Sequence, residues 1–249
     1  MPRLALIAAA ALATAISIGP ALAQENDEGH AHDVTDIWDI ARGGQLYDKW
    51  WAVIEADEPE ATHTAYPAAA KKSGSGTWRC KECHGWDYRG KDGAYAKGSH
   101  FTGITGVRGV EGMDVDALHD IIMNETHGFT ANEMSHSAME KLALFLSRGQ
   151  IDTERYIDRA SKVARGNPRR GAQFYQTICA VCHGFDGKEI NFKDADDPEY
   201  VGTVARDNPW EALHKIRFGQ PGVGMIALIA LDIDTVVDIV AYTQTLPAE

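Results

Sequence analysis

The pattern Cys-x-x-Cys-His occurs twice in this chain, at residues 80–84 and 179–183, and it uses all four cysteines. Side chains at positions i, i+3 and i+4 of a helix lie on one face, so one helical turn presents both thiols and the imidazole together. Each motif therefore predicts a short helical turn that offers three reactive groups to a single ligand. No cysteine is left over for a structural disulfide.

The two motifs belong to two degenerate copies of one longer pattern, and a repeat of this kind governs the interpretation of the whole chain. In each copy a glycine and an aromatic residue come before the motif. An Ala-Leu-His segment, a methionine and an amphipathic stretch come after it. The matching segments are residues 42–47 with 170–175 and residues 117–119 with 212–214. Three landmarks in the same order indicate two similar domains.

The two copies differ in the stretch between the glycine and the motif. Thirty-seven residues lead from Gly43 to Cys80. Only 8 lead from Gly171 to Cys179. The first copy therefore carries an insertion, at about residues 50–78, rich in turn-forming residues.

Helix signals and the absence of strand-like alternation predict an all-α fold. Ser137 begins a capping box that leads into an amphipathic helix in the first copy. Asp234 is the predicted cap of a helix over 235–245 in the second copy. Residues 151–169 have apolar residues at helical spacing and predict a helical linker packed across the two copies, with a flexible tether as the alternative.

The amino terminus predicts export. Residues 1–23 combine one basic residue, a short apolar stretch and an Ala-Leu-Ala end, which is typical of a cleaved signal peptide. The alternative is a membrane anchor, but the stretch is shorter than the roughly 20 residues that a spanning helix needs. The predicted segments are the signal peptide at 1–23, an acidic tail at 24–35, a first domain at 36–150, the linker at 151–169 and a second domain at 170–249.

The charge balance argues against binding to nucleic acids or to anionic membranes. The whole chain has 24 basic and 36 acidic side chains, a formal charge of −12. An acidic surface favours solubility and a partner that has a basic docking face. No segment after the signal peptide is long and apolar enough to cross a membrane.

The Cys-x-x-Cys-His motif is the attachment signature of a c-type haem. The two cysteines would form thioethers with the porphyrin and the histidine would bind the iron. A thioredoxin-like redox pair needs no adjacent histidine and sits in a βαβ pattern, which is missing here. A zinc site made of two Cys pairs has them 15–20 residues apart, whereas 95 residues separate Cys83 from Cys179. We therefore predict two covalent haems, held by Cys80 and Cys83 with His84, and by Cys179 and Cys182 with His183.

With these motifs in place, each copy resembles a class I cytochrome c domain, and the chain resembles the diheme c-type cytochromes made of two fused domains of this class. The resemblance covers residues 36–249, apart from the insertion. It implies a close crossing of the first and last helices of each copy. Gly43 or Gly44 would meet Phe145, and Gly171 would meet Tyr242.

The resemblance also implies a sixth, axial ligand for each iron. Met225 is the only methionine of the second copy and lies just ahead of its last helix. In the first copy, an alignment of His127-Gly128 with Phe218-Gly219 selects Met134, since both methionines then follow their glycine by six residues. The histidines of the first copy are the alternatives: His100, His127 and His136.

A haem with two protein ligands favours outer-sphere electron transfer, because the iron changes oxidation state with little rearrangement. We expect a periplasmic electron-transfer protein that works between a redox donor and a redox acceptor, and no catalytic residues. The alternatives are a cytochrome subunit of a larger dehydrogenase and a diheme enzyme such as a thiosulfate dehydrogenase. The enzyme would need an open position on one iron, and the first haem is the candidate for it.

Overall fold

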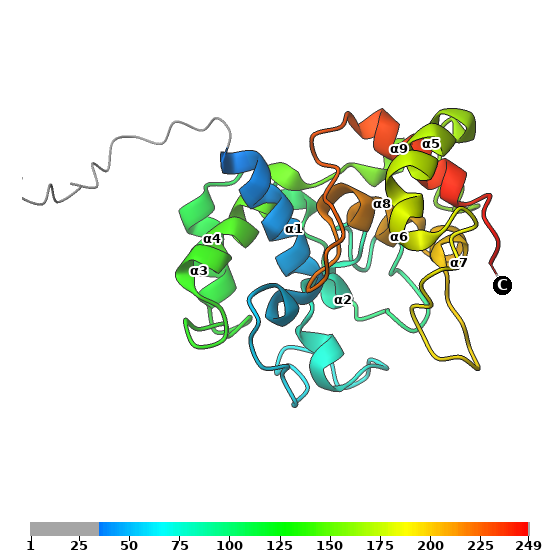
Figure 1. Cartoon of the computed structure of the whole chain (residues 1–249). Coiled ribbons are helices and arrows are strands. Elements are labelled where there is room, and N and C mark those ends of the chain that lie inside the picture. The colour runs from blue at the N-terminus through cyan, green and yellow to red at the C-terminus, as the bar shows by residue number, and fades with distance from the viewer. Residues whose placement is uncertain (1–34, 249) are drawn as a thin grey trace, which may run out of the picture. The chain divides into compact units, whose positions relative to one another are not determined.

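Two pairs of crossing helices organise the chain, α1 with α4 and α5 with α9 (Figure 1). The computed structural model describes residues 35–248. The expected signal peptide and all but the last residue of the expected acidic tail lie outside this range.

The elements follow one another in the same order in both halves, except that α7 (Val201–Asp207) has no counterpart in the first. In the first half they are α1 (Thr35–Val53, with a non-helical residue at Lys49), α2 (Cys80–His84), α3 (Val115–Met123) and α4 (His136–Leu144), which continues as a π turn over Phe145–Gly149. In the second half they are α5 (Pro168–Phe174), which continues as a π turn over Tyr175–Cys179, then α6 (Ala180–His183), α7 (Val201–Asp207), α8 (Pro209–Phe218) and α9 (Ile233–Thr243). Short 3₁₀ turns occur at Gly74–Trp78, Arg108–Val110 and Thr153–Arg155.

The all-α prediction is confirmed for the part of the chain that the structure describes. Within it there are no strands, only two isolated β-bridges. No helix among the same residues has the length and apolar character needed to span a bilayer.

Glycines allow both helix pairs to cross closely, as expected. A Cβ atom on Gly43 would lie 2.0 Å from the Lys141 carbonyl oxygen and 2.6 Å from Cβ of Phe145. A Cβ on Gly171 would lie 1.9 Å from the carbonyl oxygen of Asp238. The second crossing is therefore centred on Asp238, one helical turn before the expected Tyr242.

The two terminal helices start two residues earlier than their sequence signals suggest. Ser135, not Ser137, caps α4, because its hydroxyl accepts from the amide of Ala138. Asp232, not Asp234, caps α9 by accepting from the amide of Thr235. In both places a second residue of capping type stands two positions on, and sequence alone does not decide between them.

The linker does not form the helix that its apolar spacing predicts. Residues 156–165 fold back instead, with an antiparallel bridge between Ile157 and Ala164. The side chain of Asp158 accepts from the amide and hydroxyl of Ser161, and Lys162 adopts a φ of 61°, which together make a tight turn. Side chain–backbone hydrogen bonds of this kind compete with a helix.

The linker nevertheless packs against both halves. Arg159 donates to the carbonyl of Asp92 in the first half. Lys162 donates to the carbonyl of Asp207 in the second half. Ile157 is buried in the core, so the linker is ordered rather than a flexible tether.

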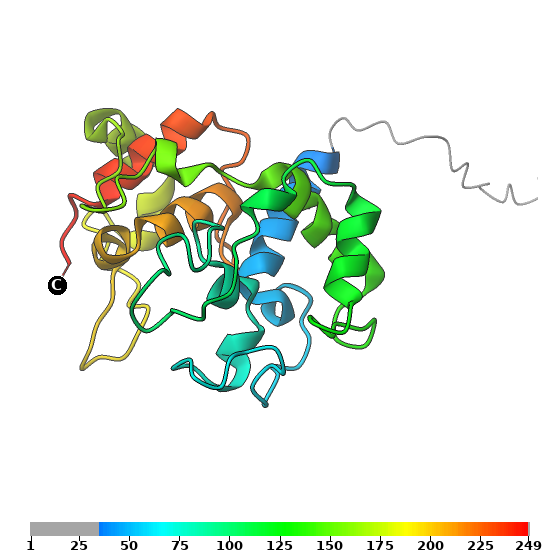
Figure 2. The same cartoon turned by 180° about the vertical axis from the view of Figure 1, so that it is seen from behind.

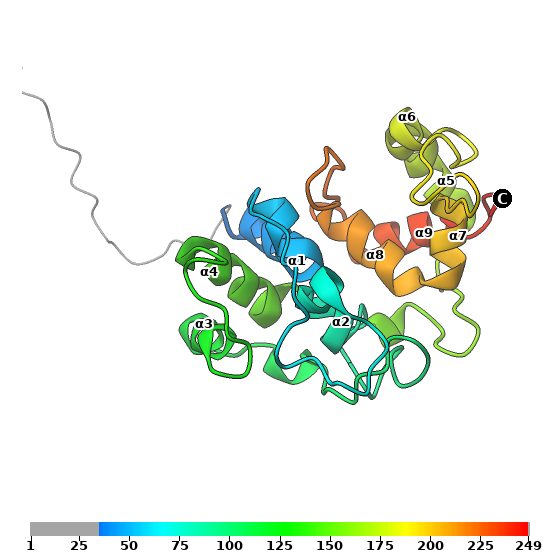
Figure 3. The same ribbon diagram turned by 90° about the horizontal axis from the view of Figure 1, so that it is seen from below.

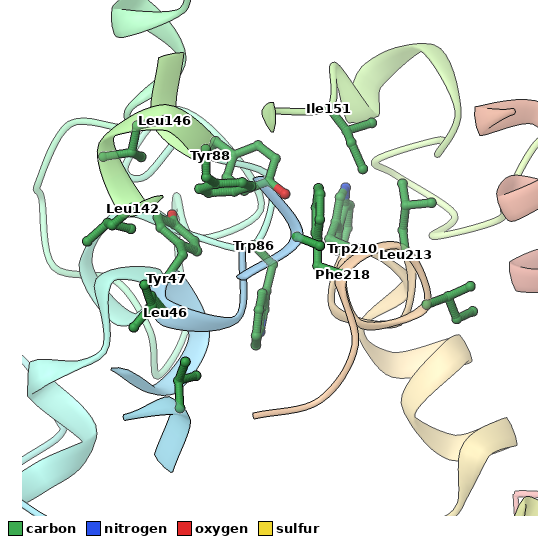
Figure 4. Packing of buried hydrophobic residues seen from close by; sticks show 14 of the residues in the cluster. Leu46, Tyr47, Trp86, Tyr88, Leu142, Leu146, Ile151, Trp210, Leu213 and Phe218 are labelled. Atoms are coloured by element: carbon green, nitrogen blue, oxygen red, sulfur yellow. The ribbon is translucent and has the colours of Figure 1, made fainter. Parts of the chain in front are cut away.

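One hydrophobic core runs through both halves, with α8 between α1 and α9 (Figures 1 and 3). A Cβ on Gly44 would lie 2.5 Å from the ring of Phe218. Adjacent glycines of α1 therefore face different partners, Gly43 toward α4 and Gly44 toward α8. In Figure 4 the Tyr88 hydroxyl points toward the α8 ribbon, which carries Leu213 and Phe218.

His214 of α8 is the polar centre of this contact. Its Nε2–H donates to the carbonyl of Gly44 over 2.8 Å, and its Nδ1 accepts from the Tyr88 hydroxyl, also over 2.8 Å. The rings of Trp86 and Phe218 lie 5.0 and 4.8 Å away. Figure 2 shows the segment after α2 that carries Tyr88, in teal, beside α8. Burial lowers the pKa of His214 to about 4, so the ring is neutral at neutral pH.

A buried carboxylate completes the contact. Asp48 is fully buried and pairs with Arg79 of its own half and with Lys215 of α8, the latter at 3.2 Å. Burial alone would raise the pKa of Asp48, but the two cations outweigh it and lower the pKa to about 2. Breaking a buried pair by removing one partner is costly, so this pair ties the two halves together.

Gly171→Ala should destabilise the protein by about 1–3 kcal/mol, because the added methyl collides with the α9 backbone. Gly109→Ala is the matched control, since a Cβ there meets nothing within 4 Å, and it should change stability by no more than about 0.5 kcal/mol. Denaturant unfolding measures both. Equal stabilities for the two variants would contradict the close crossing.

The buried His214 should make stability depend on pH. A lowered folded pKa means that the stabilisation is complete above the unfolded value of about 6.5 and is lost as the pH falls toward about 4. The loss should amount to about 3 kcal/mol. His214→Gln should flatten the unfolding free energy over this pH range. An unchanged pH profile in the variant would show that His214 is not the titrating group.

Candidate functional site: two Cys-x-x-Cys-His turns

Both Cys-x-x-Cys-His motifs form a helical turn, α2 in the first half and α6 in the second. None of the four cysteines forms a disulfide. Burial raises the pKa of Cys80 and of Cys83 to about 12, and that of Cys179 to about 11. Redox-active cysteine pairs have the opposite property, a lowered thiol pKa. The motifs therefore do not have the electrostatics of a thioredoxin-like dithiol.

The four cysteines do not come together as a zinc site either. Across residues 35–248, no group of three or more His, Cys, Asp or Glu side chains is arranged to hold a metal ion. Each motif stands by itself as a candidate site.

The two turns are anchored by the same hydrogen bond. The hydroxyl of Tyr47 donates to the carbonyl of Gly85 over 2.7 Å, and that of Tyr175 donates to the carbonyl of Gly184 over 3.1 Å. Gly85 and Gly184 directly follow the motif histidine and share one backbone conformation, with φ of 79° and 75° and ψ of 158° and 162°. The aromatic residue of each repeat thus fixes the turn that carries the motif.

His84 is held in the orientation of a metal ligand. Its Nδ1–H donates to the carbonyl of Thr105 over 2.7 Å, which leaves the Nε2 lone pair free. A second hydrogen bond of this type normally orients a metal-binding histidine. Burial lowers the pKa of His84, which favours the neutral ring that binds a metal.

The glycine-rich segment of the first half brings the Thr105 carbonyl to His84. Gly90 and Thr105 form an isolated bridge. A Cβ on Gly90 would lie 2.4 Å from the Ile104 carbonyl oxygen, and one on Gly106 would lie 2.2 Å from that of Tyr88. Only glycine permits this approach of two backbones. A Cβ on Gly98, Gly109 or Gly112 would meet nothing within 4 Å, so these three glycines make no close backbone contact.

His183 of the second half is free at Nδ1, which is buried and has no hydrogen-bond partner among the described residues. Burial lowers its pKa as well. The ring of Phe192 lies 6.0 Å from the His183 ring. The second motif therefore offers a neutral imidazole next to an aromatic side chain.

Large apolar side chains are exposed in and after the second motif and beside Met225. They are Val181 within the motif, Phe185, Ile190 and Phe192 after it, and Val223 and Ile226 on either side of Met225. Exposed apolar side chains that gather in one place mark a binding surface. A flat macrocycle with an apolar face, bound through Cys179 and Cys182, fits this surface. Met225, the predicted axial ligand, is itself half-buried among them.

The structure places the first-half candidates for the sixth ligand very differently. His100 pairs with Glu82 at 2.9 Å and stacks on Tyr95. His136 hydrogen-bonds His119 at 3.1 Å. Met134 is fully buried in the protein core. His127 is half-buried, and its ring centre lies 6.2 Å from that of His84.

The insertion supplies residues that sequence reasoning did not connect with the site. His63 contacts the carbonyl of His127 over 2.8 Å through Nε2, and its ring lies 4.4 Å from that of Trp78. Phe129 packs against Trp78 and against Trp50, each at 5.7 Å. The spacing of these residues carries no signal for this contact, because the insertion has no counterpart in the second copy.

The comparisons with known proteins agree with the second motif. The family described as "Cytochrome C oxidase, cbb3-type, subunit III" matches residues 166–242, which include α6, α8 and Met225. No curated protein and no solved structure matches the chain. Residues 166–242 therefore form a c-type cytochrome domain, which supports an electron-transfer role and implies a c-type haem in this part of the chain.

Proposed function

We propose that this chain is a diheme c-type cytochrome, exported to the periplasm, which carries electrons between two redox proteins. Cys80 and Cys83 would hold the first haem, and Cys179 and Cys182 the second. His84 and His183 would each ligate one of the two irons, and Met225 would be a further ligand of the second iron.

The observation that carries the proposal is the shared geometry of the two motifs. Both halves have two helices that cross at a glycine. Both also have a tyrosine whose hydroxyl donates to the carbonyl of the glycine after the motif. The two glycines after the motifs have matching backbone angles. Since the second half is a c-type cytochrome domain, the same arrangement in the first half supports a second haem there.

When bound, a c-type haem supplies an iron that alternates between the ferrous and ferric states. The chain's own residues do the remaining work. The motif cysteines and histidines would fix the position of each haem, and the carbonyl of Thr105 orients the imidazole of His84. The core that surrounds the first motif keeps water away from it, with Tyr47 and Trp86 fully buried.

The second site is the more accessible of the two. Cys182 is exposed, whereas Cys80, Cys83 and Cys179 are half-buried. Electron exchange with a partner falls steeply with distance, so we assign docking to the surface around residues 179–192. The net charge of −12 supports a partner that presents a basic face.

Two matched variants test the number of haems. Full-length protein from a periplasmic expression system that attaches haem should carry two haems per chain, measured by intact mass and by pyridine haemochrome. Cys80→Ala with Cys83→Ala should leave one haem, and Cys179→Ala with Cys182→Ala should also leave one.

Each of the two double variants also shows which half binds the remaining haem. Proteolysis followed by mass spectrometry should find the remaining haem on the peptide of the intact motif. A wild-type protein with one haem, bound only at residues 179–183, would contradict the diheme proposal.

A further inference from the structure

We infer that His127 is the sixth ligand of the haem iron at the first motif, which makes that haem bis-histidine where the alignment of the repeats selects Met134. The inference rests on the proposed first haem and assigns the sixth ligand of its iron.

The separation of the two rings fits a single metal ion between them. The ring centres of His84 and His127 lie 6.2 Å apart, and the ring planes are inclined by 37°. An imidazole nitrogen lies about 2.0–2.1 Å from the metal ion that it binds and about 1.2 Å from its own ring centre. Two imidazoles on opposite sides of one ion therefore have centres about 6.4 Å apart.

Both rings are held by the same kind of hydrogen bond. Nδ1–H of His84 donates to the carbonyl of Thr105 over 2.7 Å, and Nδ1–H of His127 donates to that of Ile121 over 2.9 Å. A carbonyl can only accept, so each ring has its proton on Nδ1 and a free lone pair on Nε2. Among residues 35–248, no hydrogen bond engages Nε2 of either ring. Two imidazoles with fixed Nδ1 protons and unused Nε2 atoms are a matched pair of ligands.

The loop that carries His127 is clamped by the insertion. Nδ1 of His63 accepts from the amide of Ala65, so its proton is on Nε2, which donates to the carbonyl of His127 over 2.8 Å. The rings of His63, Trp78 and Phe129 pack against one another, with centres 4.4–6.1 Å apart. The first copy, which has the insertion, is also the copy with a histidine in this loop. His63 is thus a positioning residue for His127.

Met134 does not present its sulfur in the same way. It is fully enclosed by protein, with 0% of its surface exposed, and it lies among the core residues around α4. Its backbone amide donates to Thr130 in a turn that directly precedes the helix. The other histidines of the first half are engaged elsewhere, His100 with Glu82 and His136 with His119.

Bis-histidine ligation would make the two haems unlike each other. A Met ligand raises the reduction potential relative to a second histidine. The first haem should therefore have the lower potential, and electrons that enter there would pass downhill to the haem at the second motif.

Spectroscopy of the ferric, full-length diheme protein tests the assignment. Bis-histidine and His–Met haems differ in the energy of the near-infrared charge-transfer band in magnetic circular dichroism, and only the latter has a Met–iron absorption band in the red. We expect one bis-histidine signature in the wild-type protein, and its complete loss in His127→Ala. Added imidazole should restore that signature in the variant by filling the position that the side chain left.

Met134→Leu is the matched control, because it preserves apolar volume and removes the sulfur. It should leave every band unchanged. Loss of a Met–iron band in Met134→Leu, or a bis-histidine signature that survives in His127→Ala, would overturn the inference. His127→Met tests the assignment by the gain of a signal, because it should add a Met–iron absorption band at the first haem.

The intact mass separates this inference from the proposal on which it rests. A protein without haem at the first motif would contradict the diheme function. A protein with both haems and with Met134 on the first iron would contradict only the assignment of His127.

A second pair of variants tests the clamp. His63→Phe keeps the ring packing against Trp78 but removes the donor to the His127 carbonyl, so carbon monoxide should bind the reduced first haem faster. His63→Gln, which retains an N–H donor, should bring the rate back toward that of the wild type. Equal rates of carbon monoxide binding in all three proteins would show that His63 does not position His127.

Discussion

Helix α1 touches a partner on each of two neighbouring faces, and the arrangement of both halves depends on this. Gly43 lies against α4, and Gly44 lies against Phe218 of α8. Neither contact would tolerate a Cβ atom, so two consecutive glycines let one helix join its own half to the other. His214 and Asp48 then place a hydrogen-bonded ring and a buried ion pair at the same contact. The two halves therefore share one continuous core and are not separate domains joined only by a linker.

The polar groups in this contact make its geometry specific. His214 has both nitrogens satisfied, one by a carbonyl of α1 and one by the Tyr88 hydroxyl, which lies just after the first motif. Buried polar groups with complete partners fix one arrangement, since any slippage would leave them unpaired. The corresponding histidine of the first half, His119, is partly exposed and pairs with His136. The repeat thus keeps the residue but uses it for a different contact.

Sequence predicts the motifs and the helical class because each depends on local chemistry: side chains four residues apart and capping residues leave short-range signals. The glycine crossings join distant helices, and they were expected only from the resemblance to a known class of domain. The errors are of two kinds. The predicted N-caps of α4 and α9 are wrong by two residues, because two residues of capping type stand close together, as Ser135 and Ser137 do. The linker helix was wrong because Asp158 stabilises a turn whose flanks happen to have helical spacing.

The proposed sixth ligand of the proposed first haem shows the limit of comparing the two copies within the sequence. The alignment that selects Met134 pairs His127 with Phe218, but Phe218 is the last residue of α8 whereas His127 lies four residues after Met123, the last residue of α3. The loops that follow are therefore not equivalent in space. The clamp on His127 comes from residues 63 and 78, in an insertion that has no counterpart to compare. Long-range contacts of this kind become visible only in the folded chain.

The central claim, that one chain carries two haems for electron transfer, is tested most directly by a spectroelectrochemical titration of the full-length protein. The account predicts two reversible one-electron steps per chain at different potentials, each with the optical change of a low-spin haem and without added ligand. A single one-electron step per chain would contradict it.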